Sequence, residues 1–203
     1  MKKGLPGFRD LLKEFRRLAL WGAGGAAVPF AAQLVSLSPP WPKGIVAITS
    51  TVELVTLVFV YQFLRESNQR TINRVLGVAA AALAIAGSTY LIVNSMYTFE
   101  VPTTKDRFVK GYVCTANARI VYKAKCPDLD IDDLAGAGYE ADRLWTEGSI
   151  TTVRFALDAL WLGTFIALSG LLGAFVVYQS QVPARAAGPV KRPPAKGAAK
   201  SGI

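Results

Sequence analysis

The sequence contains no histidine, so the commonest general base and an abundant metal ligand of proteins are both missing. It also lacks a Gly-x-Ser-x-Gly elbow, a Walker loop and a dinucleotide-binding glycine pattern in the right strand context. The glycines at 22–25 fall inside an apolar run, where they favour helix packing. No internal repeat or pair of inverted halves, as in transporters, is visible. These absences predict a non-enzymatic protein with no catalytic residues, no cofactor and no metal site.

Cysteine is scarce, because only Cys114 and Cys126 are present and both lie in one polar segment. A membrane thiol oxidase would need a second pair or a Cys-x-x-Cys motif with an activated thiolate, and neither occurs. An even pair in an external segment favours a disulfide over a metal site. Closing a loop of about a dozen residues is worth on the order of 3 kcal/mol in the chain-entropy model.

Hydrophobic residues, in contrast, make up 52% of the 203 residues, and the mean hydropathy is +0.32. A helix needs about 20 mostly apolar residues to cross a bilayer. Four runs meet this requirement: Leu18 to Leu37, Gly44 to Leu64, Val75 to Asn94, and Val153 to Tyr178. The sequence therefore predicts an all-α membrane protein, a four-transmembrane-helix bundle over residues 18–178. A small disulfide-stapled extracytoplasmic α+β loop, residues 96–152, is expected between the third and fourth helices.

The formal charge of +9 is unevenly distributed along the chain. Residues 1–17, 64–74 and 179–203 are basic, whereas residues 96–152 carry more acidic than basic side chains. Because short cytoplasmic flanks of membrane helices are enriched in Lys and Arg, this pattern places both termini in the cytoplasm and the long loop outside a cell inner membrane. The basic flanks are expected to attract anionic lipids of the bilayer, and this reading is favoured over nucleic-acid binding.

The two ends of the chain differ in pattern. Residues 1–17 have apolar side chains at helical spacing opposite basic ones, which predicts an amphipathic helix at the cytoplasmic interface. A cleaved signal peptide is the alternative, but no compact small-residue cleavage site follows. Residues 179–203 are rich in proline, alanine, glycine and lysine, which predicts a disordered basic cytoplasmic tail.

The long loop has an extended half and an acidic half. Alternation from Phe108 to Val113 and again from Ile120 to Tyr122, with a turn at 115–118, predicts a β-hairpin. Four aspartates then lie between Asp128 and Asp133. They lack the glycine and final glutamate of a calcium loop, so we favour N-capping of a short helix that ends near Trp145.

A few polar side chains interrupt the apolar runs. Glu53 lies near the middle of the second run, with Gln33 of the first run as a hydrogen-bond partner at similar depth. Arg154 and Asp158 are four residues apart in the fourth run, which predicts an intrahelical pair near the outer boundary. Small residues form further seams that predict close helix packing in lipid, and their glycines are Gly22, Gly25, Gly77, Gly87, Gly163, Gly170 and Gly173.

Two non-enzymatic functions fit this pattern. The first is a homo-oligomer that forms, gates or disrupts a pathway across the membrane, as the membrane effector of a bacterial defence system would. The second is a tetraspan scaffold or accessory subunit whose external loop docks an envelope protein. A cytoplasmic protein partner is compatible with either function.

Overall fold

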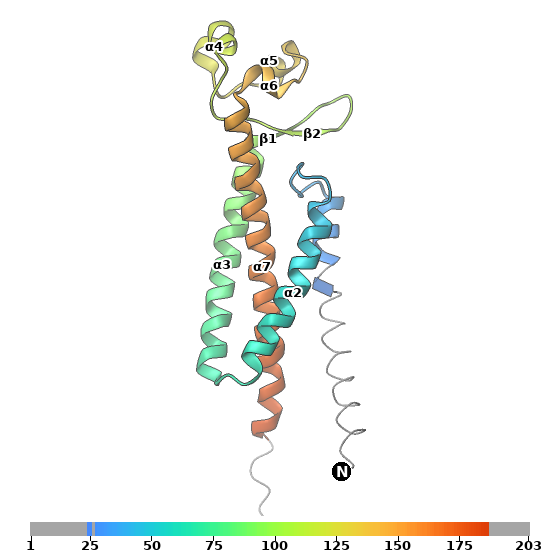
Figure 1. Ribbon diagram of the computed structural model, residues 1–203, viewed down its shortest axis with the longest axis vertical. Coiled ribbons are helices and arrows are strands. Elements are labelled where there is room, and N and C mark those ends of the chain that lie inside the picture. The colour runs from blue at the N-terminus through green and yellow to red at the C-terminus, as the bar shows by residue number, and fades with distance from the viewer. Residues whose placement is uncertain (1–23, 26, 187–203) are drawn as a thin grey trace, which may run out of the picture.

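The computed structural model describes residues 24, 25 and 27–186. These residues are mostly helical, and the polar residues 98–146 form a small domain at one end of the long helices (Figure 1). We call this domain the ectodomain and the end of the helices that carries it the outer end, and both terms name a position in the fold rather than a side of a membrane. Three helices are long and apolar enough to cross a membrane: α2 (Ile45–Arg65), α3 (Gln69–Tyr97), and the part Glu147–Gln181 of α7 (Glu147–Ala186). Three of the four predicted spans are thus membrane-length helices.

The first predicted span lies partly outside the described residues. Residues 27–34 are helical, and they lie beside the outer part of α2. The turn at 38–44 then leads into α2, where Gly44 has a φ of 91° that a side chain would make unfavourable. The amphipathic segment 1–17 and the tail from 187 onward are outside the described range.

Two helices are longer than the apolar runs indicate. Asn68 caps α3 by accepting a hydrogen bond from the Thr71 backbone N–H at 2.9 Å, so only residues 66–68 of the basic flank at 64–74 lie outside the helices. Helix α7 continues through residue 186 at its C-terminal end. Residues 179–186, which were predicted to be disordered, are therefore helical. Apolarity marks where a helix meets lipid, whereas the caps decide where it ends.

Helix α7 is the central element, because it contacts both α3 and α2 (Figure 1). The contact with α2 depends on Gly173, where an added methyl group would lie 3.1 Å from Cγ1 of Val60. A Cβ atom added at Gly25, Gly87 or Gly170 would lie 3.7–3.9 Å from the nearest side-chain atom of Leu172, Thr164 or Ala79, respectively. No described atom lies within 4 Å at Gly77 or Gly163, and Gly22 is outside the described residues.

The ectodomain begins with a two-stranded antiparallel sheet, β1 (Thr98–Glu100) and β2 (Arg107–Val109), in which Phe99 pairs with Phe108. The predicted β-hairpin, which paired 108–113 with 120–122, is wrong, because the hairpin that forms pairs 98–100 with 107–109 and shares only residues 108 and 109 with it. Residues predicted as the turn and second strand form the helix α4 (Ala116–Tyr122), which Thr115 caps by accepting from the Ala118 backbone N–H. The capping threonine and the alanines after it favour a helix over the short β-branched run.

The acidic half forms two short helices, α5 (Ile131–Gly136) and α6 (Ala141–Leu144). The predicted capping is confirmed, because Asp130 accepts from the backbone N–H groups of Asp132 and Asp133 and Asp133 completes a capping box. The single helix predicted up to Trp145 is wrong. The chain takes positive φ values at Gly138 and Tyr139, which no α-helix contains.

Trp145 organises the ectodomain core. It is fully buried, its indole Nε1 donates to the Pro127 carbonyl at 3.2 Å, and its backbone pairs with Cys114. Gly111 packs against it so closely that an added Cβ would lie 2.6 Å from Cβ of Trp145. Cys114 forms a disulfide with Cys126 across η1 (Lys123–Lys125), as predicted. This core is continuous with the outer half of the bundle through Ile150, Leu157 and Trp161.

The contact at Gly173 gives the first prediction. Gly173→Leu should separate α2 from α7, because overpacking a tight contact costs about 1–3 kcal/mol. The matched control is Gly163→Leu on the same helix, where the added side chain meets open space. Thermal unfolding in detergent should show a lower midpoint for Gly173→Leu alone. Equal losses in both variants would contradict the packing described above.

The disulfide gives the second prediction. Replacing Cys114 and Cys126 together by serine should destabilise the ectodomain by about 3 kcal/mol while the membrane helices remain folded. Hydrogen exchange at 111–130 and far-ultraviolet circular dichroism measure these two effects. Non-reducing mass spectrometry of the wild type should give a linked peptide, and two free thiols in protein prepared without reductant would contradict the bridge.

Candidate functional site

The Arg107 guanidinium joins the ectodomain to the outer ends of the membrane helices. Its Nη1 donates to the Ser38 carbonyl at 2.9 Å and also to the Ser36 carbonyl. Its Nη2 donates to the Asn94 side-chain oxygen at 3.1 Å and to the Thr98 hydroxyl at 3.2 Å. One side chain on β2 therefore binds the turn before α2 and the end of α3. We call this set of contacts the Arg107 clamp.

The clamp continues inward through two aromatic side chains. The Tyr90 hydroxyl donates to the Leu37 carbonyl, in the same turn that Arg107 binds. The Tyr90 ring packs against Trp161 at a centroid distance of 5.3 Å, and the Trp161 indole donates to the Thr49 hydroxyl at 2.8 Å. Because Thr49 is on α2, Tyr90 on α3 and Trp161 on α7, these contacts tie three helices together near the outer face.

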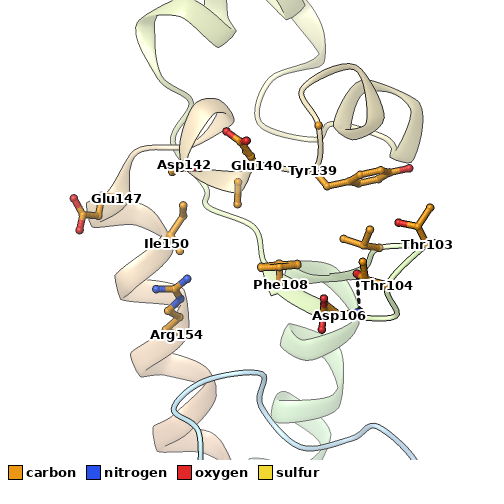
Figure 2. A pocket seen from close by; sticks show the side chains of 13 residues that line it. Thr103, Thr104, Asp106, Phe108, Tyr139, Glu140, Asp142, Glu147, Ile150 and Arg154 are labelled. Atoms are coloured by element: carbon orange, nitrogen blue, oxygen red, sulfur yellow. Dashed lines mark hydrogen bonds between the residues drawn. The ribbon is translucent and has the colours of Figure 1, made fainter.

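An open cavity of about 760 Å³ lies between the hairpin, α6 and the start of α7 (Figure 2). Its lining includes the aromatic rings of Phe108 and Tyr139 and the guanidinium of Arg154. Four acidic residues also line it, namely Asp106, Glu140, Asp142 and Glu147, although the Glu147 carboxylate points away from Phe108 and Tyr139 (Figure 2). The cavity therefore combines one cation, an excess of carboxylates and two aromatic faces.

Arg154 and Asp158 do not form the predicted intrahelical ion pair. Their nitrogen and oxygen atoms do not come within 4 Å, and the buried Nε of Arg154 and Oδ1 of Asp158 have no hydrogen-bond partner among the described residues. The two charges still attract each other over the longer distance. Arg154 instead lines the cavity, while Asp158 is buried one turn deeper. Spacing along a helix permits such a pair but does not decide which way two long side chains point.

Glu53 is buried inside one copy of the chain. Its side chain is only 2% exposed, and neither carboxyl oxygen has a hydrogen-bond partner in the described part of the protein. The predicted bond with Gln33 is absent, because Gln33 is on an exposed face. Ser169 of α7 is close enough to act on the Glu53 carboxyl group, although the two side chains do not meet the geometry of a hydrogen bond. Similar depth in the membrane did not identify the partner, since the helix facing Glu53 is α7 rather than the first run.

The far end of the ectodomain is formed by α4, which is stapled by the disulfide (Figure 1). Ile120 and Val121 of α4 are 71% and 69% exposed, although they stand outside the apolar helices. The exposed basic residues Arg119 and Lys123 flank them. We call these four residues the apolar–basic tip.

Lys125, behind the tip, binds the aspartates of the α5 cap. Its ammonium donates to both oxygens of Asp133, at 3.0 and 3.1 Å, and to Asp130 at 3.1 Å. The hydrogen bond to Asp133, and then that to Asp130, raise the pKa of Lys125. The pKa of Asp130 is lowered, first by the Asp133 backbone N–H and next by Lys125. The predicted aspartate cluster is thus neutralised in part by a lysine of this chain.

Sequence reasoning missed three residues that position these sites: Arg107, Gly111 and Trp145. Arg107 resembles any charged residue of a polar loop, because its acceptors are carbonyls about 70 positions away. Trp145 had a weak signal, since a large aromatic residue outside the apolar runs needs a core of its own. Nothing local distinguishes Gly111 from the other glycines.

The Arg107 clamp gives a third prediction. Arg107→Ala should remove charge-assisted hydrogen bonds, which are worth about 1.5–3 kcal/mol to a charged group. Arg107→Lys should recover little of the stability that Arg107→Ala loses, because an ammonium lacks the planar group of donors that reaches several acceptors at once. Hydrogen exchange should accelerate at residues 36–42 and 98–101 in both variants.

Lys105→Ala is the matched control, because the Lys105 side chain is 75% exposed and Glu100 is its one ion-pair partner among the described residues. The free energy of unfolding of this surface variant should stay within about 0.5 kcal/mol of the wild-type value. Unchanged exchange at 36–42 in Arg107→Ala would show that the clamp does not hold this turn.

A scan against protein-family models finds no match, and comparisons with curated proteins and with solved structures find none either. The function proposed below rests on the geometry of this chain alone.

Proposed function

We propose that this protein is a non-enzymatic multi-pass membrane scaffold or accessory subunit, whose ectodomain docks a protein of the cell envelope. The first apolar run acts as a fourth transmembrane helix in this proposal. Its support is that residues 27–34 are helical and that Gly25 approaches Leu172 of α7. The basic flanks favour an inner membrane, with both termini in the cytoplasm and the ectodomain outside.

The observation that carries the proposal is the firm attachment of the ectodomain to the bundle. Its core residues form one hydrophobic cluster with Tyr90, Leu157 and Trp161 of the membrane helices. The Arg107 clamp adds polar contacts at the same junction. An ectodomain attached in this way presents its surface in a fixed orientation, which reduces the entropy lost when a partner binds.

The apolar–basic tip is the surface best suited to that partner. Exposed Ile120 and Val121 offer apolar area, and Arg119 and Lys123 have no ion-pair partner among the described residues. A complementary surface would be apolar with an acidic rim, because charge complementarity steers association and fixes register. The disulfide holds α4 in place before the partner arrives.

The tip gives a fourth prediction. A photo-crosslinking amino acid at Ile120 should form a discrete adduct with an envelope protein in intact cells. Ile120→Asp with Val121→Asp should abolish that adduct when the crosslinker is at Asn117, with unchanged thermal stability because both side chains are exposed.

The matched control places the crosslinker at Thr103, an exposed position on the hairpin away from α4. Membrane-impermeant thiol labelling of Asn117→Cys in parallel checks that the tip is outside. Equal adducts from Ile120 and Thr103, or labelling of Asn117→Cys from the cytoplasmic side alone, would contradict the proposal.

Self-association with a pathway across the membrane is the second candidate function. It is favoured by the exposed face of α3, where small residues recur at helical spacing: Gly77, Ala81, Ala84 and Ser88. Glu53 would act here inside each copy, between α2 and α7, because it does not face the outside of the helices. A membrane effector that disrupts the bilayer on activation belongs to this second candidate.

Glu53 gives a fifth prediction, which separates the two functions. The pathway function expects Glu53→Gln and Glu53→Ala to change ion flux or toxicity to the host cell without changing oligomer size. Glu66→Gln is the matched control, because Glu66 is an exposed carboxylate in the loop after α2. Flux and assembly that stay at wild-type values in both Glu53 variants would remove it from any conduction mechanism and leave the scaffold function.

A further inference from the structure

The cavity beside α7 lies at the depth of lipid headgroups if α7 spans the membrane. Trp41, in the turn before α2, packs edge-on against Phe155 with ring centroids 6.3 Å apart. Tryptophan is enriched at membrane interfaces, and this contact places Phe155 in that zone. Arg154 precedes Phe155 on α7 and lines the cavity. The guanidinium therefore lies where the phosphates of the outer leaflet are found.

The charges of the cavity are separated by depth only on the side of α6. Arg154 lies closer to the long helices than Tyr139, Glu140 and Asp142 do, whereas Asp106 of the hairpin lies at about the depth of Arg154 (Figure 2). Glu140 pairs with Arg143, whereas Asp142 forms no ion pair in the described part of the chain. The buried Nε of Arg154 has no hydrogen-bond partner there either. One cation with unused donor capacity thus lies beneath carboxylates and an aromatic ring.

This order matches a zwitterion whose phosphate is deeper than its ammonium group. A guanidinium binds phosphate through paired hydrogen bonds, and carboxylates beside an aromatic face bind ammonium. We propose that the cavity binds the amine-bearing phosphodiester headgroup of an outer-leaflet phospholipid. Arg154 holds the phosphate, and Asp142, Glu140 and Tyr139 surround the ammonium. The excess of carboxylates disfavours headgroups that carry phosphate without an amine, because like charges repel.

The inference requires the ectodomain to lie at the membrane surface, but it does not depend on the docking of a partner protein. It also differs from the attraction of anionic lipids to the basic flanks, which concerns the other leaflet. The same chemistry could come from a lipid or from a free soluble headgroup, so the experiment includes both.

The experiment is native mass spectrometry of the full-length protein released from nanodiscs of equal phosphatidylethanolamine and phosphatidylglycerol. The wild type should retain the ethanolamine lipid preferentially. Arg154→Gln should reduce that retention about tenfold, as expected when a charge-assisted bond is lost. Glu140→Gln with Asp142→Asn should reduce the preference over phosphatidylglycerol. The matched controls are Lys43→Gln and Asp132→Asn, exposed residues outside the cavity.

Soluble glycerophosphoethanolamine, titrated into delipidated protein in detergent, distinguishes the two sources. Weak soluble binding with strong lipid retention assigns the outer leaflet. Tight soluble binding that Arg154→Gln abolishes would overturn the lipid assignment in favour of a free zwitterion. Equal retention of both lipids by the wild type, or an unchanged preference for the ethanolamine lipid in the carboxylate double variant, overturns the proposal even if Arg154→Gln is poorly folded.

Discussion

The outer half of this protein depends on one guanidinium, that of Arg107. Backbone carbonyls at the end of an apolar helix are costly to leave without donors near lipid, and Ser36 and Ser38 present such carbonyls. A planar side chain with five donors can satisfy several of them at once while also binding Asn94 and Thr98. The hairpin that carries Arg107 is therefore part of the helix junction rather than an appendage on it.

Helix α7 makes the second connection between the ectodomain and the long helices. It begins beside the ectodomain core at Glu147 and continues through the apolar region as one uninterrupted helix, packing on α2 and α3. A change at the ectodomain surface is thus connected to the bundle by packed side chains and one rigid helix. This continuity favours a protein that presents a surface to a partner. The burial of Glu53 within one copy limits how it could serve a conducting pathway.

The sequence predicted the parts of the fold that depend on local pattern. The apolar runs located α2, α3 and α7, the cysteine pair located the disulfide, and the aspartates located the α5 cap. Predictions failed where the outcome depends on distant contacts. The short run at 120–122 became helical because Thr115 caps it, and Glu53 faces Ser169 rather than Gln33. The cavity could not be predicted at all, since its lining joins residues from 101 to 154 that meet only after the hairpin has docked.

The central claim is that the ectodomain is held in one orientation on the bundle by the Arg107 clamp. The most direct measurement is the distance between two spin labels in nanodiscs by pulsed electron–electron double resonance. The labels replace the exposed residues Asn117 on α4 and Ala80 on α3. The wild type should give one narrow distance distribution, and Arg107→Ala should broaden it. A broad distribution in the wild type, or a narrow and unshifted one in Arg107→Ala, would contradict the account.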